Sequence, residues 1–150
     1  MSQQIKIKSG DNIIFYDGVC GLCNALVQFV LKHGGGLRFL FCSLQSDIAA
    51  RLLAKYSASN TNLDTVFVLT NYDLPTSKLL EKAQAVFFIL KHCELPWYSP
   101  WAWLVSLSFL PEFLLNFGYD FIASIRYKVF GQYESCLIPD KVVRDRFIDQ

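Results

Sequence analysis

The chain has 150 residues, a formal net charge of +1 at neutral pH and charged side chains at only 18% of its positions. This composition provides no basic surface of the kind that binds nucleic acid, so we expect no nucleic-acid partner. The length predicts one domain over residues 1–150, long enough to bury a hydrophobic core.

Apolar runs alternate with stretches of helical periodicity over about residues 11–93, the expected core. We expect strands at 13–16, 37–42, 65–70 and about 74–78. We expect helices at 21–33, about 46–56 and 79–92. The order β-α-β-α-β-β-α predicts an α/β fold with the minimal thioredoxin-like topology. Its two βαβ-type connections favour parallel strands, and the turn at 71–73 favours an antiparallel hairpin.

A C-terminal helical extension of different character is expected over about residues 95–150. It begins with an aromatic segment, residues 96–117, whose apolar stretch is interrupted by prolines and is shorter than the roughly 20 residues of a membrane span. We expect a helix packed on the domain, with its tryptophans in the core. A helix lying in a membrane interface is the weaker alternative, because a basic face is missing. A last helix is expected at 119–130, with Gly131 as its stop.

Cys20 and Cys23 form a Cys-x-x-Cys pair between the Asp17-Gly18 turn and the first helix. A thiolate is the reactive form of cysteine, and unpaired N–H groups at a helix N-terminus stabilise its negative charge. The spacing places Cys20 at that terminus, nearer to solvent, and Cys23 one turn inside the helix. We predict a redox pair in which Cys20 attacks a disulfide and Cys23 resolves the mixed disulfide. Two incidental buried thiols are the alternative.

The motif from Asp17 to Cys23, preceded by Phe15-Tyr16, resembles the DCC family of thiol–disulfide oxidoreductases, which is named for Asp-x-x-Cys-x-x-Cys. The resemblance continues through Asn24 and the helix, and then from Phe41 to residues 43–46. It resumes in a C-terminal block that contains Tyr119-Asp120, Arg126-Tyr127, Phe130-Gly131, Cys136 and Pro139. The resemblance implies a thioredoxin-like fold and a dithiol–disulfide activity in a family that is usually bacterial.

The chain departs from the family pattern at two places. Ala83-Gln84-Ala85 stands where Ser-Asp-Ala is usual before the third helix, and Ile125 replaces an Asn before Arg-Tyr. Both changes remove polar groups and put accessory contacts of the site in doubt. Thioredoxin-like redox enzymes also place a cis-proline before the third strand, whereas this chain has Asp64-Thr65 there. The missing proline weakens the case for general protein-disulfide reductase activity.

Asp17 lies three residues before Cys20 and has two interpretations. A carboxylate at this position is a candidate base for the reaction of Cys23, and we include Asp17 among the candidate catalytic residues. An Asp-Gly pair is also a standard turn, and this role carries slightly more weight because a carboxylate opposes thiolate formation. Arg126 favours a thiolate if it lies near the pair, but a surface or packing role fits the sequence equally well.

Zinc is the main rival explanation of the cysteines. Cys20 and Cys23 supply half of a tetrahedral site, which His92, Cys93 or Cys42 would complete. The chain has no second spaced pair, so we expect no metal and no cofactor.

The remaining cysteines and the two histidines have simpler explanations. His33 and His92 are explained by their positions at the ends of helices, where the helix dipole favours a positive charge. Cys42 and Cys93 are expected in the core, and Cys136 is either buried or part of a regulatory disulfide.

An odd count of five cysteines and an N-terminus without an apolar signal segment predict a reducing, cytoplasmic location.

These features predict an enzyme, a thiol–disulfide oxidoreductase of the protein-disulfide reductase type. It would exchange Cys20 and Cys23 with a protein disulfide or a small thiol or disulfide, and Gly21-Leu22 leaves both directions of electron flow open. The alternative is a non-catalytic thioredoxin-like binding module, or one peripheral to a membrane, that uses the aromatic segment 96–117 as its interface.

Overall fold

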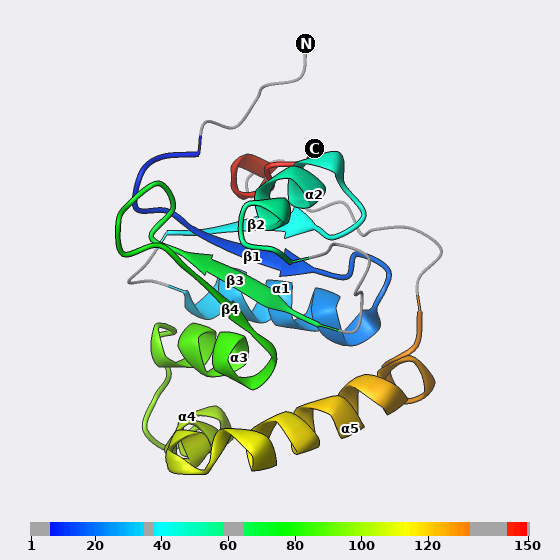
Figure 1. Ribbon diagram of the computed structural model, residues 1–150. Helices are drawn as coiled ribbons and strands as arrows, with labels where there is room; N and C mark the ends of the chain where they lie inside the picture. The colour runs from blue at the N-terminus through cyan, green and yellow to red at the C-terminus, as the bar shows by residue number, and fades with distance from the viewer. Residues whose placement is uncertain (1–6, 35–37, 59–64, 133–143, 150) are drawn as a thin grey trace.

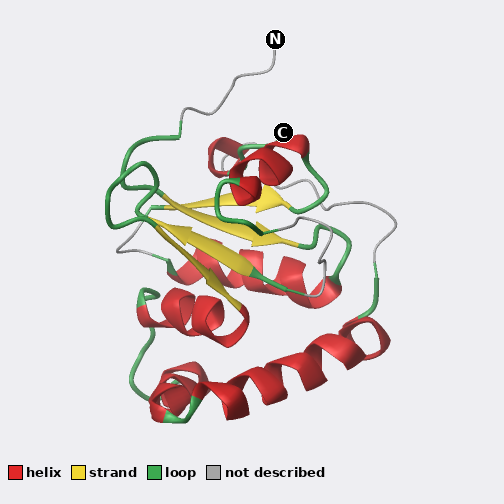
Figure 2. Cartoon of the chain, viewed as in Figure 1, coloured by secondary structure: helices red, strands yellow, loops and turns green. Residues whose placement is uncertain are grey.

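The computed structural model describes residues 7–34, 38–58, 65–132 and 144–149. Its four strands are β1 (Asn12–Tyr16), β2 (Phe39–Ser43), β3 (Phe67–Thr70) and β4 (Lys78–Glu81). Its five α-helices are α1 (Gly21–His33), α2 (Asp47–Ala54), α3 (Lys82–Lys91), α4 (Pro100–Ser106) and α5 (Glu112–Phe130). Short 3₁₀ turns occupy Leu107–Phe109 and Arg144–Arg146. Figures 1 and 2 show α2 on one face of the sheet, α1 and α3 on the other, and α4 and α5 beyond them.

The strand order in the sheet is β2-β1-β3-β4, which confirms the α/β class and the thioredoxin-like order of elements. β1 pairs with β2 in parallel, as the first connection predicts. The prediction of parallel strands for the second connection is wrong, because β3 is antiparallel to β1, with Ile14 opposite Val68. All four residues of β3 are buried. A strand that is apolar on both faces shows no alternation of apolar and polar residues. Its sequence therefore does not reveal whether it pairs in parallel or antiparallel orientation.

β3 and β4 pair in antiparallel orientation, as expected. The turn between them is longer than predicted, so β4 and α3 both begin later in the sequence. Asn71 and Asp73 have φ of 50° and 61°, and Leu74 N–H donates to the Asn71 carbonyl at 3.1 Å. β4 therefore begins at Lys78, and α3 begins at Lys82 rather than at residue 79. Leu79 pairs with Leu69 in the ladder. Here sheet pairing overrides the helical spacing of the apolar side chains.

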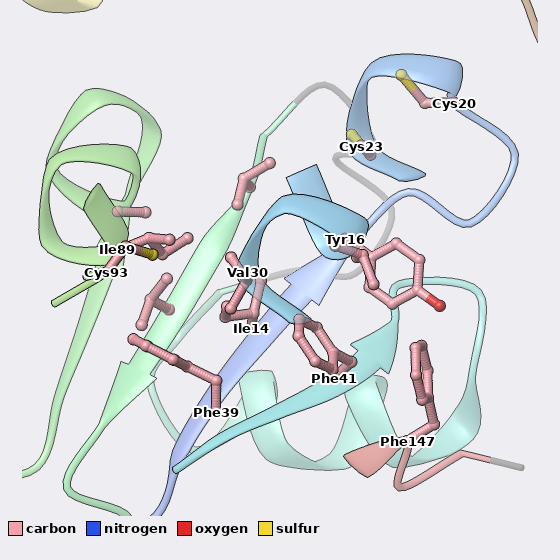
Figure 3. Close-up of a cluster of buried hydrophobic side chains, with 14 residues drawn as sticks. Ile14, Tyr16, Cys20, Cys23, Val30, Phe39, Phe41, Ile89, Cys93 and Phe147 are labelled. Carbon is pink, nitrogen blue, oxygen red and sulfur yellow. The ribbon is translucent and has the colours of Figure 1, made fainter. Parts of the chain in front are cut away.

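Apolar side chains pack on both faces of the sheet. Ile14 and Tyr16 of β1 belong to the cluster under α1 and α3, which Figure 3 shows in close-up. Ile13 and Phe15 point to the opposite face, where α2 covers them. Cys93 lies in the first cluster and Cys42 in the second, which confirms both as core residues.

The C-terminal extension differs from its expected form in two ways. α5 begins at Glu112, directly after Pro111, and is therefore seven residues longer than the predicted helix; it ends at Phe130, and Gly131 follows with a φ of 77°. The prediction that the tryptophans lie in the core is wrong, because Trp97 is 83% and Trp103 is 70% exposed. The segment is apolar on every side, so whichever face packs on α3, another remains in contact with solvent.

Residues 144–149 return to the sheet, which sequence periodicity did not predict. Phe147 stacks on Phe41 with ring centroids 5.1 Å apart, and Ile148 N–H donates to the Phe41 carbonyl at 3.0 Å. Figure 3 shows Phe147 beside Tyr16 and Phe41 at the end of the core cluster. Across the described ranges, none of the helices has the length and hydropathy needed to cross a membrane.

Candidate active site

Cys20 and Cys23 lie together at the N-terminus of α1, as the spacing predicts. Cys20 is the N-cap residue in an extended conformation, and Cys23 lies in the first turn. Both are free thiols, and they lie one helical turn apart. Figure 3 shows the two sulfur atoms at this end of the helix, above the sheet. The geometry brings the two predicted redox cysteines into direct contact.

The contact between the thiols separates their pKa values. The hydrogen bond from Cys23, which outweighs burial, lowers the pKa of Cys20 from 9.0 to about 6, and the backbone N–H groups of Cys23 and Leu22 and the charge of Arg126 act in the same direction. The same thiol–thiol contact, together with burial, raises the pKa of Cys23. At neutral pH Cys20 is therefore the thiolate and Cys23 the hydrogen-bond donor.

Neither cysteine is open to solvent, although Cys20 was expected to lie nearer to it. The exposed fraction is 0% for Cys20 and 3% for Cys23. Residues 130–132, which we call the strap, cover this end of α1. Gln132 forms an antiparallel bridge with Cys20, and Gly21 N–H donates to the Gly131 carbonyl at 3.2 Å. A Cβ on Gly21 would lie 2.2 Å from the Phe130 carbonyl oxygen, so only glycine allows this close approach.

Asp17 is buried at the end of β1, and its carboxylate accepts several hydrogen bonds. Its Oδ1 accepts the Val19 N–H at 3.1 Å and the Gln45 side-chain amide at 2.8 Å. Its Oδ2 accepts the Arg126 guanidinium at 3.3 Å and the Tyr127 hydroxyl. The bond to Val19 is the local turn that the Asp-Gly pair predicts, and the other three bonds anchor distant segments to this turn.

Gln45 and Asn24 hold the same turn from two other directions. The Gln45 side-chain oxygen accepts the Gly18 N–H at 3.2 Å and the Ser43 hydroxyl. The Asn24 side-chain amide donates to the carbonyls of Gly18 at 2.9 Å and Cys20 at 3.0 Å. Sequence analysis assigned no role to either side chain, although both lie in the segments that resemble the DCC family. Their place in those segments was the available signal, because the burial of Asn24 is known only from the structure.

Arg126 of α5 lies close to the cysteines, which decides between its two interpretations. Its side chain is buried and forms an ion pair with Asp17, and it contacts the Tyr127 hydroxyl at 2.8 Å. Its positive charge helps to lower the pKa of Cys20 and opposes the rise in the pKa of Cys23. Burial and the bond to Asp17 raise the pKa of Tyr127 to about 12, so Tyr127 remains a neutral donor. A buried guanidinium needs such a partner, because a lone buried charge is costly.

The backbone before β3 is built without a proline. The described residues contain no cis peptide bond. Val66 N–H donates instead to the Tyr119 hydroxyl of α5 at 2.8 Å. Burial raises the pKa of Tyr119 to about 12, so the hydroxyl stays protonated. A side chain from the C-terminal block thus bonds to the backbone where related redox folds place cis-proline.

The described residues provide no set of ligands for the zinc site considered above. They hold no group of three or more His, Cys, Asp or Glu that is arranged to bind a metal ion. His33 and His92 each bond through Nδ1 to the carbonyl four residues earlier, at 3.1 and 2.8 Å, in keeping with their positions at helix ends. Cys136 and Pro139 lie outside the described residues.

Comparisons with known proteins identify the family of the chain. The chain is 30% identical to Bacillus subtilis YuxK, an uncharacterized protein, over 138 residues that cover 92% of the chain and 94% of the relative. It is 33% identical to a chloroplastic DCC family protein of Arabidopsis thaliana over 124 residues, 83% of the chain and 67% of the relative. No solved structure matches it. A family model matches residues 14–132, and the chain therefore belongs to the DCC1-like thiol-disulfide oxidoreductase family.

Proposed function

We propose that the protein is a thiol–disulfide oxidoreductase that works through Cys20 and Cys23. Membership of the family supports a redox function in general. The observation that carries the assignment to this pair is the placement of both free thiols at the α1 N-terminus, where the pKa of Cys20 is lowered to about 6. A thiolate of low pKa beside a protonated thiol is the arrangement needed for attack followed by resolution.

In the reducing direction the Cys20 thiolate attacks one sulfur of a substrate disulfide and forms a mixed disulfide. The other substrate sulfur leaves as a thiolate. Cys23 then loses its proton, attacks Cys20 and releases the second substrate thiol, which leaves a Cys20–Cys23 disulfide. Two thiols of the enzyme are oxidised for each substrate disulfide that is reduced, and the reverse sequence oxidises a dithiol.

Asp17 remains the candidate base for Cys23. Its contacts support a positioning role in addition, because its carboxylate holds Arg126 beside the two sulfurs.

The buried free thiols Cys42 and Cys93 are consistent with a reducing, cytoplasmic location, which we propose for the protein. The substrate we propose is a protein disulfide or a small-molecule disulfide.

Trapping of the mixed disulfide tests the assignment. Cys23→Ser removes the resolving thiol, so a small disulfide such as bis(2-hydroxyethyl) disulfide is expected to leave a stable adduct on Cys20, read by intact-protein mass and peptide mapping. Cys20→Ser is expected to give little adduct, because burial, which does not depend on Cys20, still raises the pKa of Cys23. Cys42→Ser, in the other core cluster, is the control and should behave as wild type. Equal labelling of Cys20 and Cys23 in the single variants would contradict the assigned roles.

A second candidate function is a peripheral membrane module. The observation that favours it is an exposed apolar surface on residues 97–130, which we call the aromatic face. It contains Trp97, Trp103, Phe109, Phe113, Phe117 and Phe121, each at least 60% exposed. Exposed aromatic patches of this kind mark interaction surfaces, and Trp and Tyr prefer membrane interfaces.

Vesicle sedimentation separates the two functions. Binding to phosphatidylcholine vesicles that is unchanged by Cys20→Ser and reduced by Trp97→Ser/Trp103→Ser would support the membrane module. Absence of binding for the wild-type protein would exclude it and leave the redox proposal untouched.

A further inference from the structure

An apolar cavity of about 440 Å³ lies between α1, α3, α4 and α5, next to the redox pair. Its walls include Leu26, Val86, Ala123 and Cys23. The polar groups of Tyr119 and Arg126, which also line it, are bonded to Val66 and Asp17. Such walls offer little to water and suit an apolar ligand, and the volume falls within the range of small-molecule pockets.

The cavity reaches one residue of the redox pair. Cys23 lines it, and Cys20 lies one helical turn away at the α1 N-cap. A group that reaches Cys23 from the cavity therefore lies beside the sulfur that attacks. The thioredoxin-like core alone does not build this cavity, because residues of α4 and α5 form part of its lining. These two helices lie beyond α1 and α3 (Figure 1).

Part of the cavity wall, on α4 and α5, is also exposed to solvent. Trp101, Leu104, Ile122 and Phe130 line the cavity and are also 38–49% exposed. Residues 96–111 beside it contain no charged side chain. An apolar molecule thus meets apolar surface from solvent to the cysteines.

An extended peptide meets less favourable surroundings at the same pair. Gln132 of the strap already forms a bridge with the Cys20 backbone. Val66 N–H is bonded to the Tyr119 hydroxyl. Both backbone positions beside the cysteines are therefore engaged within the chain, and a substrate strand would have to displace these bonds.

Building on the proposed redox function, we propose that the cavity binds the apolar body of the substrate and that the substrate is a small lipophilic disulfide. Its sulfur atoms lie at Cys23, within reach of the Cys20 thiolate. One substrate disulfide bond is exchanged for the Cys20–Cys23 disulfide, and two apolar thiols are released.

Binding is tested without catalysis in the Cys20→Ser protein, with the neutral apolar dye N-phenyl-1-naphthylamine as the probe. Ala123→Phe fills the cavity, and Ser124→Phe adds the same side chain to the neighbouring exposed position of α5. We expect dye affinity to fall at least about tenfold in Ala123→Phe and to be unchanged in Ser124→Phe. Ala123→Leu, a smaller change, should give an intermediate loss if Ala123→Phe does not fold. Equal affinity in all folded variants would overturn the proposal.

Kinetics then identify the substrate class in the protein with both cysteines. Di-n-propyl disulfide and bis(2-hydroxyethyl) disulfide have the same number of heavy atoms and differ only in a terminal methyl or hydroxyl group. We expect kcat/KM to be at least about tenfold higher for the dipropyl compound, and Ala123→Phe to lower that value more than the value for the hydroxyethyl compound. Equal values for the two compounds would overturn the proposal and leave the redox function standing. No turnover of either compound or of a protein disulfide would refute the redox function itself, while the dye result still reports on the cavity.

Discussion

Asp17 and Arg126 are 109 positions apart in the chain and meet in an ion pair at 3.3 Å, with both side chains buried. Asp17 directly follows β1 and precedes the cysteine pair, and Arg126 comes from α5 of the C-terminal extension. The pair therefore ties the extension to the reactive end of α1. Because a buried charge without its partner is costly, this contact makes the extension part of the site.

Removal of both partners should cost less than the sum of the two single removals. Arg126→Gln leaves the Asp17 carboxylate buried without its cation, so we expect the free energy of unfolding to fall by about 3–5 kcal/mol. The double variant Asp17→Asn/Arg126→Gln should lose less than the sum of the single changes. Urea unfolding of the reduced proteins measures both. Asp120→Asn is the control, because its ion pair with Lys82 is exposed and is expected to be worth at most about 1 kcal/mol. Strict additivity at Asp17 and Arg126 would contradict the coupling.

The reactivity of Cys20 should follow the pKa of its thiol. With that pKa lowered to about 6, the rate of alkylation by iodoacetamide in the Cys23→Asn protein, which keeps a hydrogen-bond donor, should rise with pH well below 9. Cys42→Ser serves as the background control, since burial raises the pKa of Cys42 to about 12. A midpoint near 9 would show that the helix terminus and Arg126 do not stabilise the thiolate.

The same shift predicts how stability depends on pH. Between pH 6 and 9 the folded Cys20 has lost a proton that the unfolded chain still binds, so the free energy of unfolding of the reduced protein should increase with pH across this window. The raised pKa of Cys23 acts only above about pH 9 and with the opposite sign. Cys20→Ser should reduce the rise, and denaturant titrations at several pH values provide the comparison. An identical slope in wild type and Cys20→Ser would contradict the assignment.

A methyl group on Gly21 should displace the strap. The Phe130 carbonyl lies 2.2 Å from the position of the added Cβ, so Gly21→Ala forces residues 130–131 away from α1. We expect lower stability together with faster alkylation of Cys20, because the strap covers that residue. Gly118→Ala in the middle of α5 has open space around its Cβ and should stabilise the protein by about 0.5–1 kcal/mol without changing alkylation. Unchanged alkylation in Gly21→Ala would show that the strap does not control access.

Local features of the site were predictable from the sequence, and its tertiary contacts were not. The pair at the start of α1 follows from a strand, a turn and a helix that are adjacent in sequence, and α1 spans the predicted residues. Arg126 was a candidate without a partner, because no periodicity reports which residues meet across 109 positions. The cover over Cys20 was missed for the same reason. It comes from Gln132, after the last helix, and exposure depends on that distant segment.

The central claim is that Cys20 and Cys23 form one redox couple, and a redox titration tests it most directly. The purified protein is equilibrated in defined dithiol and disulfide buffers, its thiols are trapped by alkylation, and the labelled forms are counted by mass. The account predicts one reversible two-electron transition that links Cys20 to Cys23 and disappears in both Cys20→Ser and Cys23→Ser. A transition that persists in either variant, or no transition at these two residues, would contradict it.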